Sequence, residues 1–170
     1  MKPSSAQGMT VREIDDELFR SLDEIPPNPR RIRHLIEQGA NVNAKDKDGY
    51  SVLWHCLAIG QAQRAIIELL VESGANIDQE KDMLLSDTCV HAPLSDVAFE
   101  VIAYLLGKGA NPNLVVAGNT PLPLDFVEHF CFCYSKWCKE GRKGFSEALE
   151  HMSAIARLLR DAGAKRASEL

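Results

Sequence analysis

The pentapeptide Gly74-Ala75-Asn76-Ile77-Asp78 follows an apolar run, and related phrases occur at three other places in the chain. They are Gly39-Ala40-Asn41-Val42-Asn43, Gly109-Ala110-Asn111-Pro112-Asn113 and the shorter Gly163-Ala164-Lys165. A leucine stands four residues before each glycine, and an isoleucine or alanine stands seven before it, which is the spacing of one helix face. Glycine commonly follows a helix C-terminus, because it adopts the left-handed conformation without steric cost. Each phrase therefore predicts the end of a helix.

The spacing of these phrases predicts a repeat architecture. The four glycines are separated by 35, 35 and 54 residues, and each interval holds about one helical pair, which cannot bury its apolar face alone. We therefore predict an all-α solenoid of four helix-pair units. The predicted units are approximately 10–43, 44–78, 79–113 and 114–170; together they form a single domain, 10–170, after a disordered N-terminus, 1–9.

The first unit has clear helix-start signals. Thr10 and Glu13 have the spacing of a capping box, so we expect a helix from Val11 to about Glu24. Asn28 followed by Pro29 predicts the start of a second helix, which runs to Gln38. The first turns of that second helix carry three arginines, which the helix dipole disfavours. We therefore expect acidic residues of the first helix to lie near them.

The second unit carries the most specific motif. The segment Asp48-Gly49-Tyr50-Ser51-Val52-Leu53-Trp54-His55-Cys56 precedes Gly74 by the length of one helical pair, and further motif matches begin at Thr88 and Thr120. This pattern resembles the ankyrin repeat, whose usual Thr-Pro-Leu-His-x-Ala is matched here at Leu53, with Ser51 in place of the threonine. Residues at the threonine position are expected to cap the short helix of each pair.

The fourth unit departs from the ankyrin pattern. From Thr120 to Gly163 there are 43 residues where the second unit has 23, so about 20 residues have been added. Helical periodicity continues through the addition, which predicts an elongated helical hairpin with a turn at residues 141–144. One predicted stripe is Phe126, Phe130, Cys133 and Trp137, and the other is Phe145, Leu149, Met152 and Ile155. The resemblance covers residues 12–126 and 150–167.

Composition limits the function. The chain has 170 residues and a net charge of −5, which argues against binding to a phosphate backbone as the main role. It has neither a signal-peptide pattern nor an apolar run of the length that a membrane span needs. We expect a cytoplasmic protein that binds neither nucleic acid nor membrane and is a monomer without its partner. Five cysteines, an odd count, are expected to be reduced thiols.

Only one cluster in the sequence could supply metal ligands: His129, Cys131, Cys133 and Cys138. On a continuous helix Cys131 and Cys138 share a face, while Cys133 pairs instead with His129, so the four do not converge. We therefore expect no metal and no cofactor. The sequence also shows no glycine-rich phosphate loop or metalloprotease helix, and we expect no catalytic residues and no enzymatic activity.

The resemblance implies binding through the concave side of the array, where ankyrin repeats use their turns and short helices. Carried over to the second unit, the contact positions are Lys45, Lys47, Asp48, Tyr50, Ala58 and Ile59. A second candidate surface is the basic, tryptophan-containing tip of the fourth unit. Its residues are Lys136, Trp137, Lys139 and Arg142.

The expected function is that of a non-catalytic protein–protein interaction module: an adaptor, an effector, an inhibitor or an immunity-type antitoxin. The negative net charge favours a basic protein partner, through steering of association. The alternative is a metal- or thiol-dependent activity, or a membrane or nucleic-acid contact, through the cysteine-rich, aromatic and basic insertion of the fourth unit.

Overall fold

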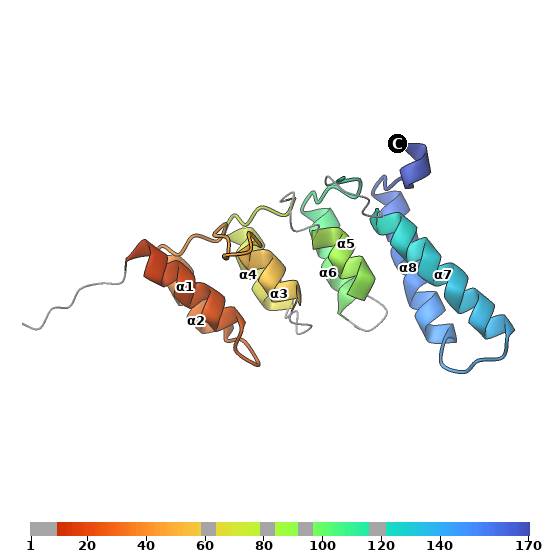
Figure 1. The fold of residues 1–170 in the computed structure, drawn as a ribbon, viewed down its shortest axis with the longest axis horizontal. Helices are drawn as coiled ribbons and strands as arrows, with labels where there is room; N and C mark the ends of the chain where they lie inside the picture. The colour runs from red at the N-terminus through yellow and green to blue at the C-terminus, as the bar shows by residue number, and fades with distance from the viewer. Residues whose placement is uncertain (1–9, 59–63, 79–83, 92–96, 116–121) are drawn as a thin grey trace, which may run out of the picture. The chain divides into compact units, whose positions relative to one another are not determined.

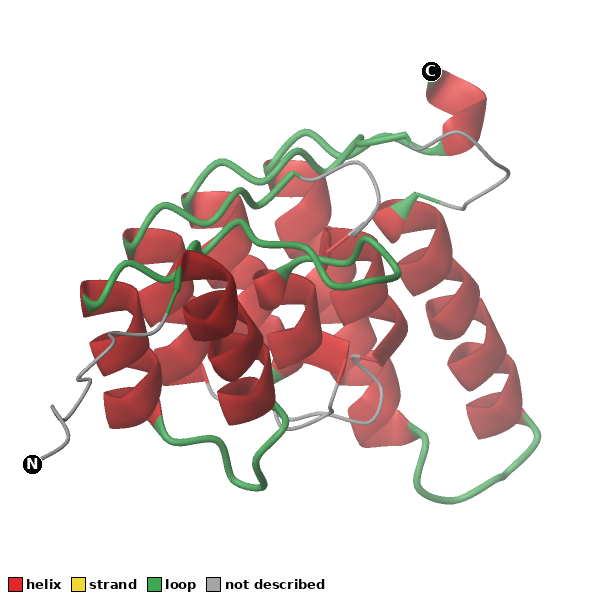
Figure 2. Ribbon diagram, turned by 60° about the vertical axis from the view of Figure 1, so that its left-hand side comes forward, coloured by secondary structure: helices red, strands yellow, loops and turns green. Residues whose placement is uncertain are grey.

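The computed structural model of the chain describes residues 10–58, 64–78, 84–91, 97–115 and 122–170. Within these residues all regular elements are helices and no strand occurs (Figures 1 and 2); residues Lys45 and Ser51 form an isolated β-bridge. The prediction of an all-α protein is confirmed for this part of the chain. The predicted disorder of 1–9 concerns residues outside it.

The chain divides into two compact units, Met1–Ala75 and Asn76–Leu170, and each contains two of the predicted helical pairs. The helices of the first unit are α1 (Val11–Leu22), α2 (Pro29–Glu37), α3 (Val52–Ala58) and α4 (Arg64–Glu72). Those of the second are α5 (Leu84–His91), α6 (Ala98–Gly107), α7 (Pro123–Lys139), α8 (Ser146–Asp161) and a short 3-10 helix, η2 (Ala167–Glu169). None of the described helices is long and apolar enough to cross a membrane.

Both units are built in the same way. In the first unit α1 packs on α2 and α3 on α4, while α1 also contacts α3 and α2 contacts α4. In the second unit α5 pairs with α6 and α7 with α8, and the contacts between the pairs are again α5 with α7 and α6 with α8. Each unit is therefore two helical hairpins stacked side by side in two layers.

The four glycine phrases end their helices in one conformation. Gly39, Gly74, Gly109 and Gly163 have φ values of 100°, 94°, 93° and 83°, which side chains with a Cβ rarely adopt. In each case the amide of the following alanine donates to the carbonyl of the leucine four residues before the glycine, at 2.9 to 3.0 Å. This is the C-terminal cap that the sequence predicts.

The predicted N-terminal caps of the first unit are also present. The Thr10 hydroxyl accepts from the Glu13 amide at 3.3 Å, and the Glu13 carboxylate accepts from the Thr10 amide at 2.8 Å. The Asn28 side chain accepts from the Arg30 amide at 3.0 Å, and the Ser51 hydroxyl accepts from the Trp54 amide at 3.1 Å. These bonds satisfy amides that have no partner within their helices.

The arginines of α2 have the neighbours that their position requires. Arg31 forms ion pairs with Glu17 of α1 and, at 2.8 Å, with Glu24 in the connection between the two helices. This contact confirms the expectation that acidic residues lie near the start of α2.

The apolar faces of the four helices of the first unit form its core, in which Leu18, Ile32, Ile66, Ile67 and Leu70 are fully buried.

The third pair begins earlier than the sequence indicates. Thr88 was expected to cap the short helix, but α5 already begins at Leu84, so Thr88 lies inside it. Its buried hydroxyl donates to the Leu84 carbonyl at 2.7 Å, which satisfies the threonine without a cap. The additional turn buries Leu84 and Leu85, and this burial explains the earlier start.

The elongated hairpin of the fourth pair is confirmed. Helices α7 and α8 have 17 and 16 residues, compared with 7 to 10 for α3 to α6, and they lie side by side (Figure 1). The start of α7 is at Pro123, with Leu122 at the cap position; Thr120 and Pro121 lie outside the described residues. All four residues of the second predicted stripe belong to the core: Phe145, at the cap position of α8, and Leu149, Met152 and Ile155 within α8. On α7 Phe130 and Trp137 join it as predicted, whereas Phe126 and Cys133 do not and Val127 and Tyr134 are buried instead.

Candidate functional site

A groove of about 850 Å³ lies in the first unit, between α1 and the connection from α2 to α3. Charged residues dominate its lining, with Phe19 as its one aromatic hydrocarbon side chain. The α1 wall is Arg12, Asp15, Asp16, Phe19 and Arg20, and the facing wall is Asn41, Ala44, Lys45, Asp46, Lys47, Asp48 and His55. Its volume is in the range of ligand-binding clefts, but its lining is far more polar than that of a typical small-molecule site.

The facing wall is a tight turn organised by Asp46. The Asp46 carboxylate accepts hydrogen bonds from the amides of Asp48 and Tyr50, at 2.9 and 2.8 Å, and its own amide donates to the Tyr50 carbonyl at 2.9 Å. Gly49 completes the turn at φ 86°, a conformation that favours glycine. The turn is therefore held by the Asp46 carboxylate and by backbone hydrogen bonds, and the side chains of Lys45 and Lys47 are left exposed.

His55 of α3 connects the turn to α1. Its Nε2 lies 2.8 Å from an Asp46 carboxylate oxygen, and its Nδ1 lies 3.7 Å from Asp23, just after α1. The Phe19 ring meets the His55 ring edge-on, with centroids 5.0 Å apart. His55 therefore links the two walls of the groove. Its polar contacts reach Asp46 in the turn and Asp23 after α1, and the contact with Phe19 of α1 orients its ring.

These contacts also set the ionisation of Asp46. Burial opposes the charged form, but the hydrogen bonds from His55 and from the amides of Tyr50 and Asp48 outweigh it and lower the pKa of Asp46. The carboxylate is therefore ionised at neutral pH. Its oxygens accept hydrogen bonds from its own loop and contact His55, so they have little capacity left to bond a ligand.

The structure brings together three of the six contact residues predicted from the repeat 44–78, since Lys45, Lys47 and Asp48 line the groove of the first unit. Tyr50 does not line it. Its ring stacks on Trp54 at 4.0 Å between centroids, half-buried, so it supports the turn. Ala58 is the last residue of α3, and Ile59 lies outside the described residues.

The α1 wall was not predicted from the sequence, although Arg12, Asp16, Phe19 and Arg20 line the groove. A usable signal was present, because residues 12, 16 and 19 share one helix face and include an aromatic residue opposite the buried Ile14 and Leu18. The contact partner of that face, the turn at 44–48, is distant in sequence and could not be identified from helix periodicity.

The tip of the fourth pair, in the second unit, has a different character. Trp137 packs against Tyr134 and Phe145, with centroids 5.6 and 4.8 Å away, and the Arg142 guanidinium lies over the Trp137 ring at 5.6 Å. Lys136 and Lys139 instead line a shallow hollow of about 310 Å³ together with Phe132, Ser135 and Glu140. The predicted set of four residues is therefore split between the hairpin's own core and its surface.

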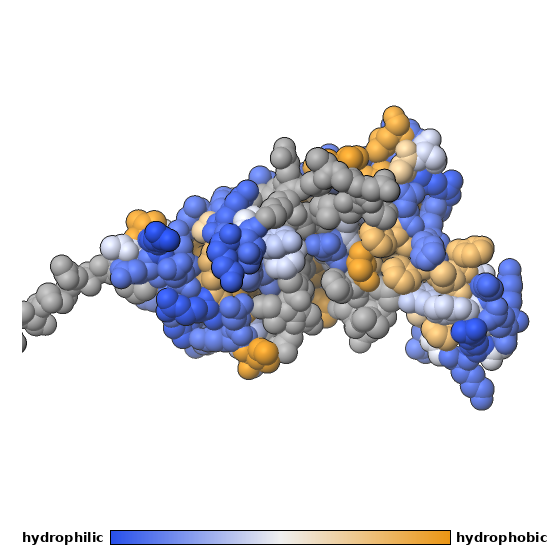
Figure 3. All heavy atoms as spheres, viewed as in Figure 1, coloured by the Kyte–Doolittle hydropathy of each residue, from blue (hydrophilic) through white to orange (hydrophobic). Residues whose placement is uncertain are grey.

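The surface composition also differs between these regions. In the view of Figure 3 the described surface of the first unit is mainly hydrophilic, whereas hydrophobic and hydrophilic residues alternate around the fourth pair. Phe132 on α7 is 70% exposed and was not predicted as a surface residue. A single exposed aromatic side chain is common on protein surfaces and does not define a binding site by itself.

The cysteines do not form a metal site within the described residues, where no group of three potential ligands converges. All five are free thiols. Cys133 lies 3.6 Å from His129, which is the pairing that helix geometry predicts, while Cys131 lies 3.9 Å from the Ser153 hydroxyl. Burial raises the pKa of the Cys56 and Cys89 thiols to about 12, so neither is a nucleophile at neutral pH.

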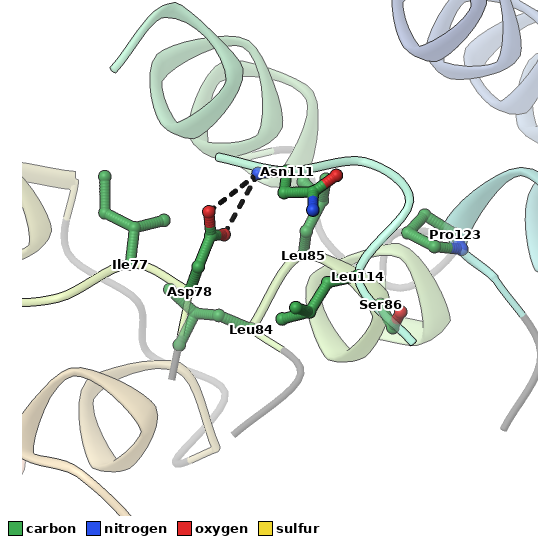
Figure 4. Close-up of a pocket in the computed structure, with 8 residues that line it drawn as sticks. All are labelled: Ile77, Asp78, Leu84, Leu85, Ser86, Asn111, Leu114 and Pro123. Carbon is green, nitrogen blue, oxygen red and sulfur yellow. Dashed lines mark hydrogen bonds between the residues drawn. The ribbon is translucent and has the colours of Figure 1, made fainter. Parts of the chain in front are cut away.

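A second cavity, in the second unit, is structural. Figure 4 shows Asp78 directed at Asn111, whose amide donates to both carboxylate oxygens at 3.0 and 3.1 Å. The enclosed volume is about 10 Å³, enough for about one water molecule. It therefore has no room for an organic ligand.

No protein-family model matches this chain. A comparison with curated proteins finds similarity to a TRPM8 channel-associated factor homolog from Danio rerio, with 27% identity over 118 residues. The aligned region covers 65% of this chain and 13% of that protein, so the chain corresponds to a small part of its relative.

Proposed function

We propose that this protein is a non-catalytic interaction module of the ankyrin-repeat type, which binds a segment of a protein partner in the groove between α1 and the 44–48 turn. The observation that carries the proposal is the groove itself. It contains the turn residues that the ankyrin resemblance marks as contact positions, and a pre-formed hydrogen-bonded turn presents them.

Repetition of the loop hydrogen bonds supports the ankyrin-type array. The Asn43 side-chain amide donates to the Gly74 carbonyl at 3.0 Å in the first unit, and Asn113 makes the same bond to Gly163 in the second. The Asn111 amide donates to Asp78, and the Lys165 amide to Asn113 at 2.7 Å, again at equivalent repeat positions. Repeats that contact only their neighbours require such a recurring bond, because each new loop must be fixed to the one before it.

The chemistry of the groove favours a polypeptide ligand. Most of its lining side chains are charged, and they come from a helix face and a turn rather than from a closed apolar cavity. A small molecule would bury little apolar surface there, whereas an extended segment can pair with several charged groups and cover Phe19. The name of the similar protein, a channel-associated factor, also describes association with another protein.

A thiol- or metal-dependent activity in the fourth pair is the rival function. It would use the Cys133–His129 pair, the one thiol–imidazole contact among the described residues. Nucleophilic catalysis also requires a group that orients the imidazole, and no hydrogen bond from His129 to such a group is present in the described part of the chain. We therefore favour binding over catalysis.

A peptide-display selection on the full chain tests the proposal. Random 12-residue peptides that bind the protein should lose about 2 kcal/mol of affinity, roughly thirtyfold, when Phe19→Ala removes the groove's aromatic side chain. The matched control is Phe132→Ala on the exposed face of α7, which should bind the same peptides as the unsubstituted chain. Peptides that respond to Phe132→Ala and not to Phe19→Ala would move the site to the hairpin and contradict the proposal.

A further inference from the structure

The outer face of α7 carries a thiol and an imidazole in contact with each other. Cys133 follows His129 by four residues, so both side chains lie on one face of the helix. The Cys133 Sγ lies 3.6 Å from the His129 Nε2. His129 is exposed, Cys133 is half-buried, and neither belongs to the core of the second unit. The pair is therefore accessible to a ligand from outside the chain.

The separation of these two atoms matches one edge of a tetrahedral zinc site. Zinc binds a cysteine sulfur at about 2.3 Å and a histidine nitrogen at about 2.0 Å. At a tetrahedral angle these two bonds place the sulfur and the nitrogen about 3.5 Å apart. Both side chains can therefore bind one ion with little movement.

The chain supplies no third ligand at this position. Cys131 lies 3.9 Å from the Ser153 hydroxyl of α8. The two carboxylates within one turn of His129 are engaged with the C-terminal segment: Asp125 accepts from the first amide of η2 at 3.1 Å, and Glu128 accepts from Arg166 at 2.6 Å. No group of three potential ligands converges in the part of the chain that the structure describes. Since structural zinc sites have four protein ligands, the pair is half of such a site.

We propose that the Cys133–His129 pair is completed by the same pair of a second copy of this chain, so that one zinc ion bridges two α7 helices. A two-fold axis through the ion supplies each ligand twice, and two thiolates with two imidazoles are a ligand set that zinc prefers. Each thiol releases its proton to solvent on binding, and the two thiolates balance the charge of Zn²⁺. The site lies in the second unit and does not depend on the proposed function of the groove. It departs from the expectation of a monomer without metal, which considered one chain alone.

The same part of α7 carries aromatic surface that a second copy would cover. Phe126 precedes His129 by three residues and lies outside the core of the unit. Phe132 directly precedes Cys133 and is 70% exposed. Covering both side chains favours association, because it removes apolar surface from water. One helix face buries too little area for a stable dimer by itself, so association should require the ion.

Analytical ultracentrifugation of the full chain tests the proposal, with zinc chloride as the probe, no histidine tag and a non-thiol reductant. The chain should sediment as a monomer in the presence of a chelator and as a dimer with zinc, and calorimetric titration should give one zinc ion per two chains. Cys133→Ser and His129→Ala should each weaken zinc binding at least about a hundredfold and abolish the dimer, because each removes two of the four ligands. Their circular dichroism should match that of the unsubstituted chain, since neither residue belongs to the core. The matched control is Cys138→Ser, a half-buried thiol of the same helix, which should leave the zinc-dependent dimer intact.

Four results would overturn the proposal. The first is a chain that stays monomeric at saturating zinc, and the second is a stoichiometry of one zinc ion per chain. A dimer that persists in the chelator would show that association does not need the metal. Zinc binding that survives both Cys133→Ser and His129→Ala would be adventitious binding by other side chains. None of these results affects the groove, which Phe19→Ala tests separately.

Discussion

The groove of the first unit and the hairpin tip of the second both combine aromatic and charged residues, but they arrange them differently. Beside the groove the stacked rings of Tyr50 and Trp54 support the turn, and Lys45 and Lys47 of this turn form no ion pair with the described residues. In the hairpin the rings of Tyr134, Trp137 and Phe145 pack between the chain's own helices, and Arg142 covers one of them. Aromatic content and positive charge in the sequence are therefore poor guides to a binding surface. Lys136 and Lys139 at the tip are exposed and form no ion pair with the described residues either. What distinguishes the two regions is that α1 and the 44–48 turn enclose a groove, whereas the tip carries only a shallow hollow.

The largest expected effects are on stability, at equivalent positions of the two units. Leu70 and Leu159 are fully buried and precede their helix-ending glycines by four residues. Leu70→Ala and Leu159→Ala should each reduce the free energy of unfolding by about 2 to 5 kcal/mol, because each leaves a cavity. Urea denaturation measures the losses, with the exposed Glu72→Ala as a control near zero. A loss below about 1 kcal/mol for either leucine would mean that the repeat phrase does not mark a core position.

Trp137→Ala separates a structural role of the hairpin tip from a binding role. The ring is half-buried in contact with two other aromatic rings, so its removal should cost about 1 to 3 kcal/mol of stability. Affinity for groove-binding peptides should not change. Phe132→Ala, on the exposed face of the same helix, should alter stability by less than about 0.5 kcal/mol. A Trp137→Ala protein that is as stable as its parent and binds peptide poorly would reverse the comparison.

Two carboxylates, Asp46 in the groove and Glu128 near the start of α7, should make the fold sensitive to acid. Asp46 in the groove and Glu128 in the second unit both have lowered pKa values. For Glu128 the hydrogen bond from Arg166 is the main cause, opposed by burial and assisted by Arg160. A group whose pKa is lower in the folded state stabilises the fold fully above its unfolded pKa, near 4, and loses that contribution as the pH falls through the folded value. Asp46→Asn should cost about 1 kcal/mol at pH 7 and remove this part of the pH dependence.

This variant leaves the two charged or polar neighbours of Asp46 unchanged. His55 and Asp23 face the same contact, and both remain in the Asp46→Asn variant. Denaturation at pH 7, 5 and 3 should therefore show the difference between variant and parent shrinking only between pH 5 and 3. A difference that has already disappeared at pH 5 would contradict the assignment to Asp46.

The smallest expected effect is that of the exposed turn cations. Lys47→Ala should change the free energy of unfolding by less than about 0.5 kcal/mol, since the turn is held by Asp46 and by backbone bonds. Thermal denaturation measures this change. A clear loss of stability would mean that Lys47 has a structural contact and is not available to a ligand. In contrast, replacing Tyr50 should cost more, because its ring stacks on Trp54.

Much of this fold could be predicted from the sequence, because local chemistry decides most of it. The helix-ending glycines, the caps at Thr10, Asn28 and Ser51, and the long hairpin all follow from residue spacing. Thr88 was assigned wrongly because the burial of Leu84 and Leu85, a tertiary effect, extends α5 past the motif. The α1 wall of the groove was missed for a similar reason: contacts between residues about 30 positions apart leave no local pattern. Which charges remain unpaired is likewise a property of the folded chain.

The central claim is that partner binding occurs at the groove of the first unit. Amide chemical-shift mapping by NMR, with the ¹⁵N-labelled full chain and a peptide selected for binding, tests it most directly. On addition of the peptide we expect the largest changes in amide chemical shift in residues 12–20 and 41–55, and no change in the shifts of residues 129–143. Shifts concentrated in 129–143, with 12–20 and 41–55 unaffected, would contradict it and place the binding surface on the hairpin.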